Sequence, residues 1–140
     1  MTIGLNPYLT FDGTAREAMT FYQAVFGGTL EVMTFGDMGM EGAGADKVMH
    51  AYLGTDDGFV LMASDMPPGQ DGVMPGTTNV TVSISGDDER IRGFWEALSD
   101  GATVTQPFER QMWGDEYGQL VDRYGISWMV NLGSGEQPQG

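Results

Sequence analysis

The chain has 140 residues, of which 6 are lysine or arginine and 20 are aspartate or glutamate, and its net charge is −14. This charge repels nucleic-acid phosphates and anionic lipid surfaces, so neither nucleic acid nor a membrane is expected as a partner. Cysteine is absent, which excludes disulfides, thiolate catalysis and zinc–thiolate sites. No secretory signal pattern opens the chain and no apolar run is long enough to span a bilayer, so we expect a cytoplasmic protein.

The first half of the chain predicts one strand, one helix and three further strands. Ile3–Phe11 has the aromatic and branched residues of a strand, and Asp12-Gly13 ends it. Thr14 and Glu17 form a capping-box pattern, in which the threonine hydroxyl accepts a hydrogen bond from a free helix N–H. The helix then carries apolar residues at i, i+3, i+4 and i+7 and ends at Gly27-Gly28. The three further strands are Thr29–Phe35, Lys47–Leu53 and Phe59–Ser64, with a loop at Gly36–Asp46.

The second half repeats this order of elements. Thr77–Ser85 predicts a strand, and the helix after it has the same apolar spacing at Ile91, Phe94, Trp95 and Leu98. Acidic residues precede this helix, where the helix macrodipole favours negative charge. The remaining strands are Thr103–Phe108, Gly118–Arg123 and Ile126–Leu132.

The spacing between the halves indicates an internal duplication. Asn6 and Asn79 are 73 residues apart, as are Gly13 and Gly86, and the last strands align at a shift of 67. The shift changes because the first half has the longer loop. We therefore predict one structural domain made of two modules and a linker. The ranges are 1–65 for the first module, 66–76 for the linker, 77–133 for the second module and 134–140 for a flexible tail.

Two helices have too little apolar surface to cover both faces of two sheets. The economical arrangement packs one helix on the convex side of each curled sheet and leaves the concave sides facing a shared cleft. The predicted fold class is therefore α+β, with tandem βαβββ modules that form curled mixed sheets around this cleft.

Six segments within residues 3–132 form a recognisable pattern. They are Asn6–Phe11, Ala18–Gly28, His50–Leu53, Ser64-Asp65, Met112–Gly118 and Asp122–Asn131. This pattern resembles the vicinal-oxygen-chelate superfamily, which includes glyoxalase I, extradiol dioxygenases and bleomycin-resistance proteins. Within it, the chain is most similar to the PhnB-like branch, some members of which carry a misleading 3-demethylubiquinone methyltransferase label.

The resemblance implies four metal-ligand positions, one on the first strand and one on the last strand of each module. The matching residues are Asn6, Met62, Asn79 and Met129. The metal enzymes of the superfamily have His, Gln or Glu at these places. Amides and thioethers bind hard or borderline divalent cations poorly, and the same-face neighbours Ser64 and Asn131 are little better. We therefore expect no cofactor and no tightly bound metal, and at most a weakly held divalent ion.

His50 is the single histidine of the chain, and the PhnB-like pattern has a histidine in this strand. A cleft-facing His50 would be a general base or a polar anchor for a ligand; otherwise it is a structural histidine bonded to its neighbours. Aromatic residues such as Tyr8 and Trp113 either line an apolar cleft or belong to the core. The expected ligand-binding residues are Asn6, Tyr8, Met62, Asn79, Trp113, Met129 and Asn131.

Two functions remain open at this point. The first is a superfamily protein that binds a small molecule in the inter-module cleft without a tightly bound catalytic metal. The second is a glyoxalase-like lyase or isomerase that acts on a vicinal-oxygen substrate, with His50 as general base. Methyl transfer is disfavoured, because nothing in the sequence resembles a nucleotide or methyl-donor site. The resemblance also implies a homodimer, since members of the superfamily frequently dimerise.

Overall fold

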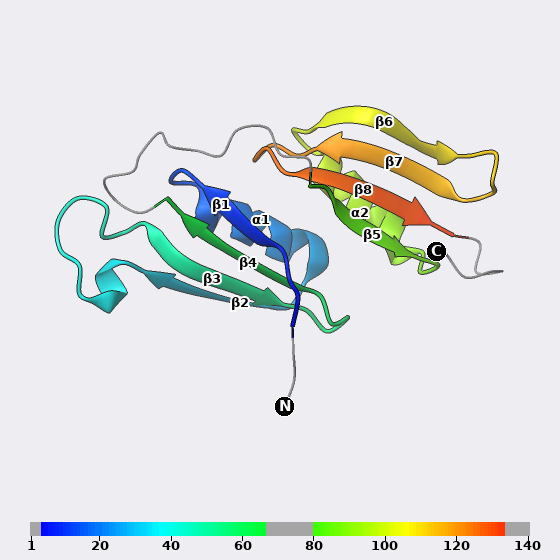
Figure 1. Ribbon diagram of the computed structural model, residues 1–140. Coiled ribbons are helices and arrows are strands. Elements are labelled where there is room, and N and C mark those ends of the chain that lie inside the picture. Colours follow the sequence, from blue (N-terminus) through cyan, green and yellow to red (C-terminus); the bar gives the residue numbers. More distant parts are fainter. Residues whose placement is uncertain (1–3, 67–79, 134–140) are drawn as a thin grey trace. The chain divides into compact units, whose positions relative to one another are not determined.

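The computed structural model describes residues 4–66 and 80–133 (Figure 1). These residues belong to two compact units, 1–77 and 78–140. The predicted linker, apart from Met66, and the predicted tail lie outside the described residues, as does Asn79. Within the described ranges, no helix has the length and apolar character needed to cross a bilayer.

The first unit has the predicted βαβββ order. Its elements are β1 (Tyr8–Phe11), α1 (Ala15–Phe26), β2 (Thr29–Thr34), β3 (Val48–Gly54) and β4 (Val60–Asp65), with a short 3₁₀ helix η1 (Gly36–Met38) in the predicted loop. The four strands form one sheet in the order β1-β4-β3-β2. The β1–β4 pair is parallel and the other two pairs are antiparallel, so the predicted mixed sheet is confirmed.

The second unit repeats this topology. Its elements are β5 (Val82–Gly86), α2 (Arg90–Ser99), β6 (Thr103–Arg110), β7 (Glu116–Val121) and β8 (Ser127–Leu132). The sheet order is β5-β8-β7-β6, again with one parallel pair, β5–β8. The βαβββ order and the mixed sheet are therefore confirmed in each unit, with one α-helix in each among the residues that the structure describes.

The first strand is shorter than predicted. It begins at Tyr8 rather than Ile3, and Leu5 is almost fully exposed. Tyr8 lies opposite Met62, and β4 begins only at Val60, so β4 offers no pairing partner to the residues before Asn6. A strand pattern in the sequence does not form a strand where no neighbouring backbone is available.

Each helix covers one face of its own sheet. Met19, Tyr22 and Phe26 of α1 are buried, and the residues of β3 and β4 beneath the helix, such as Ala51 and Ala63, are completely covered. In α2 the predicted apolar face is confirmed, because Ile91, Phe94, Trp95 and Leu98 are all buried. Figure 1 shows both helices lying against a sheet face. Among the described residues, no helix of the same unit lies on the opposite face of either sheet.

The N-terminus of α1 is capped by a residue far away in the sequence. Asp65, at the end of β4, is buried, and its Oδ1 accepts hydrogen bonds from the backbone N–H groups of Gly13 and Ala15 at 2.9 Å each. Its Oδ2 accepts a third, from the N–H of Val48 at 2.9 Å. The predicted cap was wrong, because the Thr14 side chain makes no capping hydrogen bond. A carboxylate is a stronger acceptor than a hydroxyl group, and Asp65 takes that place.

The turns of the two hairpins carry a polar acceptor at the same repeat position, although the residue type differs. Thr55 Oγ1 accepts a hydrogen bond from the N–H of Phe59 in the first unit. Its counterpart Asp122 accepts hydrogen bonds from the N–H groups of Tyr124 and Ile126, and from Trp128 Nε1 at 2.8 Å. A polar acceptor at the same turn position therefore closes both hairpins, which supports the duplication.

An ion pair and a close approach hold α2 against β7. Arg92 donates to both carboxylate oxygens of Glu116, at 2.8 and 2.7 Å, and these bonds lower the pKa of Glu116. Gly118 packs beneath the helix. A Cβ atom there would lie 2.8 Å from the Trp95 ring and 2.9 Å from the Cα of Phe108, so only glycine fits.

Asp65→Asn should destabilise the fold strongly. The amide removes the charge, and its NH₂ group replaces one of the two oxygens that accept from backbone N–H groups, so a donor then faces a donor. Hydrogen bonds to a charged group contribute roughly 1.5–3 kcal/mol each, so we expect the free energy of unfolding to fall by about 3 kcal/mol. Urea denaturation measures this change. Asp88→Asn is the control, because Asp88 accepts a hydrogen bond from the N–H of Arg90 at the exposed start of α2. Equal losses for the two variants would contradict the role assigned to Asp65.

Gly118→Ala and Gly93→Ala should change stability in opposite directions. The first forces a methyl group against Trp95 and the β6 backbone, and overpacking of this kind costs about 1–3 kcal/mol. A Cβ at Gly93, within α2, would meet nothing within 4 Å. Alanine is preferred over glycine in a helix by about 1 kcal/mol, so this variant should unfold at a higher temperature than the parent. A Gly118→Ala variant as stable as the parent would show that the close packing is not required.

Candidate functional site

One register row crosses all four strands of the first sheet on the face opposite α1. Tyr8 of β1 lies opposite Met62 of β4, Met62 lies opposite Tyr52 of β3, and Tyr52 lies opposite Glu31 of β2. Directly paired residues point to the same face of a sheet. We call these four residues the central row. With strands about 4.8 Å apart, the row spans roughly 14 Å.

The adjacent row contributes a histidine that bonds to the central row. His50 of β3 lies opposite Met33 of β2, and Thr10 lies opposite Ser64. The Oη atom of Tyr8 and the Nδ1 atom of His50 lie 3.1 Å apart, and their ring centroids are 5.8 Å apart. Which of these two atoms donates depends on the tautomer of the imidazole. The hydrogen bond fixes both rings on the open face of the sheet.

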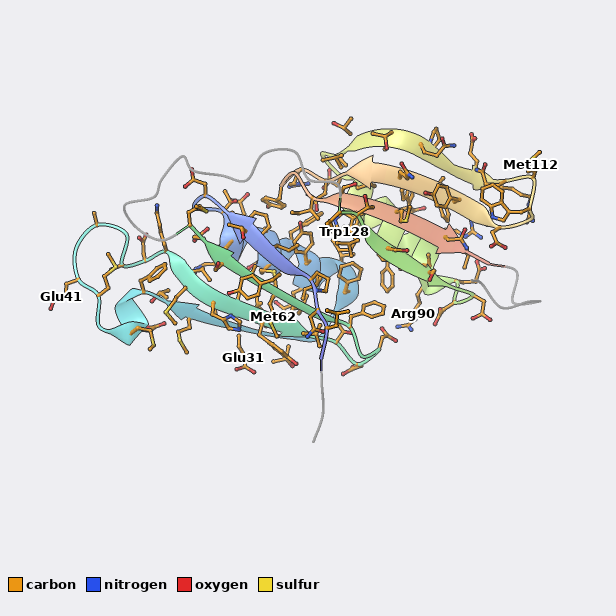
Figure 2. All side chains as sticks on the ribbon, viewed as in Figure 1. Glu31, Glu41, Met62, Arg90, Met112 and Trp128 are labelled. Atoms are coloured by element: carbon orange, nitrogen blue, oxygen red, sulfur yellow. The ribbon has the colours of Figure 1, made fainter. Side chains whose placement is uncertain are left out.

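An open hollow of about 490 Å³ lies over β2 and β3. It is lined by Glu31, Val32, Met33, His50 and Tyr52. Met33 is 40% exposed and Tyr8 is 50% exposed, so apolar surface on this face contacts solvent. The β2–β3 register shifts between Met33 and Thr34, and an irregularity of this kind re-aims side chains beside a site. Figure 2 marks Glu31 and Met62 on this unit.

The second sheet has a different chemistry at the corresponding row. Met129 takes the place of Met62, but its neighbours across the sheet are Ser83, Gln119 and Gln106. This row carries neither an aromatic ring nor a charge. The duplication has therefore kept the methionine and changed the side chains around it.

The next row of the second sheet holds two further residues of interest. Asn131 lies opposite Tyr117 and donates from Nδ2 to Asp115 Oδ2 at 3.0 Å. Trp113 stands in the β6–β7 turn, 55% exposed, with its ring 6.2 Å from the ring of Tyr117. Arg110 donates to the carbonyl of Gly114 at 2.7 Å and so closes this turn.

The structure groups the expected site residues by unit. On the first sheet it brings together Tyr8, Met62 and His50, and exposed Asn6 stands just before β1. On the second unit it places Met129 and Asn131 on the open face and Trp113 on a turn. The sequence prediction did not include Tyr52 and Glu31. Both alternate with buried residues along their strands, and this period-two pattern was the available signal.

The superfamily's metal positions do not fit a divalent ion in this chain. Asn6 and Met62 of the first unit and Met129 of the second offer one amide and two thioethers. In the part of the chain that the structure describes, His, Cys, Asp and Glu side chains form no group of three or more that could hold a metal ion. Hard cations require oxygen ligands, and zinc requires imidazole, thiolate or carboxylate ligands. The amide and thioether groups at these positions therefore differ from the His, Gln or Glu ligands that the resemblance implies.

Comparison with known proteins places nearly the whole chain in one family. A family model described as 3-demethylubiquinone-9 3-methyltransferase matches residues 4–131. An uncharacterized protein of Mycobacterium bovis is 32% identical over 131 residues, covering 90% of this chain and 80% of that protein. The crystal structure of protein PA1353 from Pseudomonas aeruginosa is 36% identical, with a TM-score of 0.80 over 94% of this chain and 98% of that one.

More distant structures share the fold. A PhnB protein from Bacillus cereus, described as a putative 3-demethylubiquinone-9 3-methyltransferase, is 22% identical, with a TM-score of 0.74 over 93% of this chain and 99% of its own. A glyoxylase/bleomycin resistance protein/dioxygenase domain from Frankia is 17% identical, with a TM-score of 0.60 over 95% and 98%. The fosfomycin resistance protein FosX of Listeria monocytogenes, complexed with Mn(II) and sulfate, is 10% identical, with a TM-score of 0.59 over 95% and 94%. The chain therefore belongs to the family described as 3-demethylubiquinone-9 3-methyltransferase, and it shares its fold with the glyoxylase/bleomycin resistance protein/dioxygenase domain.

Proposed function

We propose that this chain binds a small molecule on the open face of the first sheet, the face that the duplication predicts to line a cleft. The central row, with His50 hydrogen-bonded to Tyr8, carries this proposal. Ligand sites combine a mainly apolar surface with a few fixed polar groups, and typical sites enclose about 300–1,000 Å³. The hollow over β2 and β3, at about 490 Å³, has this size and this mixture of side chains.

The exposure of this face supports a binding role over a purely structural one. Tyr8, Met33 and Met62 contribute apolar atoms to a face that α1 does not cover. A contiguous apolar patch rimmed by polar groups commonly marks an interaction site. Relatives of the same fold are named for fosfomycin and bleomycin resistance, and both of these antibiotics are small molecules.

The proposed binding takes place without a tightly bound catalytic metal, since the matching positions offer amide and thioether groups. A weakly held divalent ion remains compatible with those groups. Methyl transfer, which the family's description names, is not part of the proposal, because the sequence has no motif resembling a nucleotide or methyl-donor site.

A second candidate function is favoured by the Tyr8–His50 contact. In this alternative the protein is a glyoxalase-like lyase or isomerase, and His50 removes a proton from a vicinal-oxygen substrate. Tyr8 would hold the imidazole ring in place through the 3.1 Å contact with Nδ1. Binding and catalysis would then share one face of the sheet.

Tyr8→Ala and Met62→Ala should each weaken ligand binding by about tenfold, because each removes one member of the central row and about 1.5 kcal/mol of contact. A panel of planar aromatic compounds and hemithioacetals, screened by thermal shift and quantified by calorimetry, supplies the probes. Met112→Ala is the matched control, since Met112 is 98% exposed on a turn of the second unit (Figure 2). Unchanged affinity in both first-sheet variants would refute the proposed site. Turnover of a hemithioacetal that is lost in His50→Ala would instead favour the enzyme.

The purified protein should retain well below one equivalent of Zn, Ni, Mn or Fe after incubation with each ion and dialysis, because its donor set is weak. Elemental analysis measures the metal content, and EDTA should leave the affinity for the small molecule unchanged. One tightly held equivalent of metal, or binding abolished by EDTA, would contradict the metal-independent site.

A further inference from the structure

We infer that the ligand of this open face is a flat aromatic cation and that Glu31 selects it by charge. The inference rests on the proposed function, because it names the class of molecule that the same site takes. Three features carry it: the charge of the face, the surroundings of Tyr52 and the contrast with the second sheet.

Glu31 gives the face an uncompensated negative charge. Among the residues of the central row and the adjacent row, Glu31 is the single carboxylate. It is exposed and makes no hydrogen bond or ion pair with any other residue in 4–66 or 80–133. Neither row contains lysine or arginine. The overall charge of −14 adds an attractive field for a cation and a repulsive one for an anion.

The side chains beside Glu31 suit a flat ring. Tyr52 lies directly opposite Glu31, so their Cβ atoms are about 5 Å apart. The Tyr52 ring lies along β3 over Gly54, where a Cβ would stand 3.0 Å from the ring atom Cε1. Met62 lies opposite Tyr52 on the neighbouring strand, and thioethers contact aromatic rings favourably. A cation held above an aromatic ring gains about 0.5–2 kcal/mol, depending on how far it is desolvated.

The second sheet shows that this combination is not an inevitable product of the duplicated fold. Its corresponding row has Ser83, Gln119 and Gln106 around Met129. The carboxylate and the rings of the central row are therefore not repeated at that row, and the second sheet has its own pair of this kind one row further on, where Glu109 lies opposite Tyr117. The length of the central row, roughly 14 Å, matches a molecule of two or three fused rings.

The test uses two compounds of the same shape, the cation N-methylquinolinium and the neutral 1-methylnaphthalene, titrated into the isotopically labelled full chain. Two-dimensional NMR measures both affinities and shows which backbone amides shift. The cation should bind about fivefold tighter than the neutral compound and should shift the amides of Tyr52 and Met62, in line with one cation–π contact beside an exposed carboxylate.

Glu31→Gln should abolish the preference for the cation and leave the affinity for the neutral compound within about twofold, since the amide keeps the size of the side chain. Glu31→Asp should keep part of the preference. Glu41→Gln is the matched control, because it also removes one negative charge but from the exposed loop between β2 and β3 (Figure 2). The Glu41→Gln variant should prefer the cation over the neutral compound as strongly as the parent chain does.

Two results would overturn the inference on its own: equal affinity of the parent chain for the two compounds, or an equal loss of preference in Glu31→Gln and Glu41→Gln. The second result would show a general charge effect in place of selection by Glu31. If neither compound shifts the amides of the first sheet, the proposed function itself fails. The pattern of shifted amides therefore distinguishes failure of the inference from failure of the proposed function.

Discussion

The buried carboxylate of Asp65 is the interaction on which the first unit depends. It joins the end of β4 to the N-terminus of α1 and to the beginning of β3 through three backbone N–H groups. These contacts fix the helix over one face of the sheet and set the ends of the strands that carry Tyr8, Met62 and Tyr52. In the second unit, Asp122 ties its hairpin turn to Trp128 in a similar way. A buried carboxylate is tolerated only when donors surround it, and the donors around Asp65 come from segments 17 to 52 residues away in the chain, so Asp65 requires the folded unit.

The two repeats share one arrangement of strands and helix but differ in the side chains of their open faces. Met62 and Met129 occupy the same place in their sheets, but the parallel strand pairs differ in register. Tyr8 lies opposite Met62. The repeat spacing of 73 would put Thr81 opposite Met129, but Ser83 lies there instead. A slide of two residues keeps every side chain on its original face, so the core is unaffected. The solvent-facing rows carry no such packing constraint, and the row of Met62 differs from the row of Met129 in charge and in aromatic content.

The family's description and the chemistry of the open face point in different directions. Methyl transfer requires a place for a methyl donor, and a Mn(II) ion such as the one in the FosX complex requires hard ligands. The open face presents rings, thioethers, an imidazole and one carboxylate instead. Soft and aromatic groups of this kind suit recognition of an organic molecule through stacking and charge, and this is the basis of the binding role proposed for the first sheet.

The sequence by itself determined the two repeats, the helix faces and most strands, because these depend on periodicities read over a few neighbouring residues. The family resemblance likewise came from short segments, and it placed His50 among the residues of interest. Tertiary structure alone decided that Asp65 and not Thr14 caps α1, because the two partners are 50 residues apart in the chain. It also decided that Glu31, Tyr52, Met62 and Tyr8 form one row. Pairing register between distant strands is set by the packed core as a whole, and no local pattern records it.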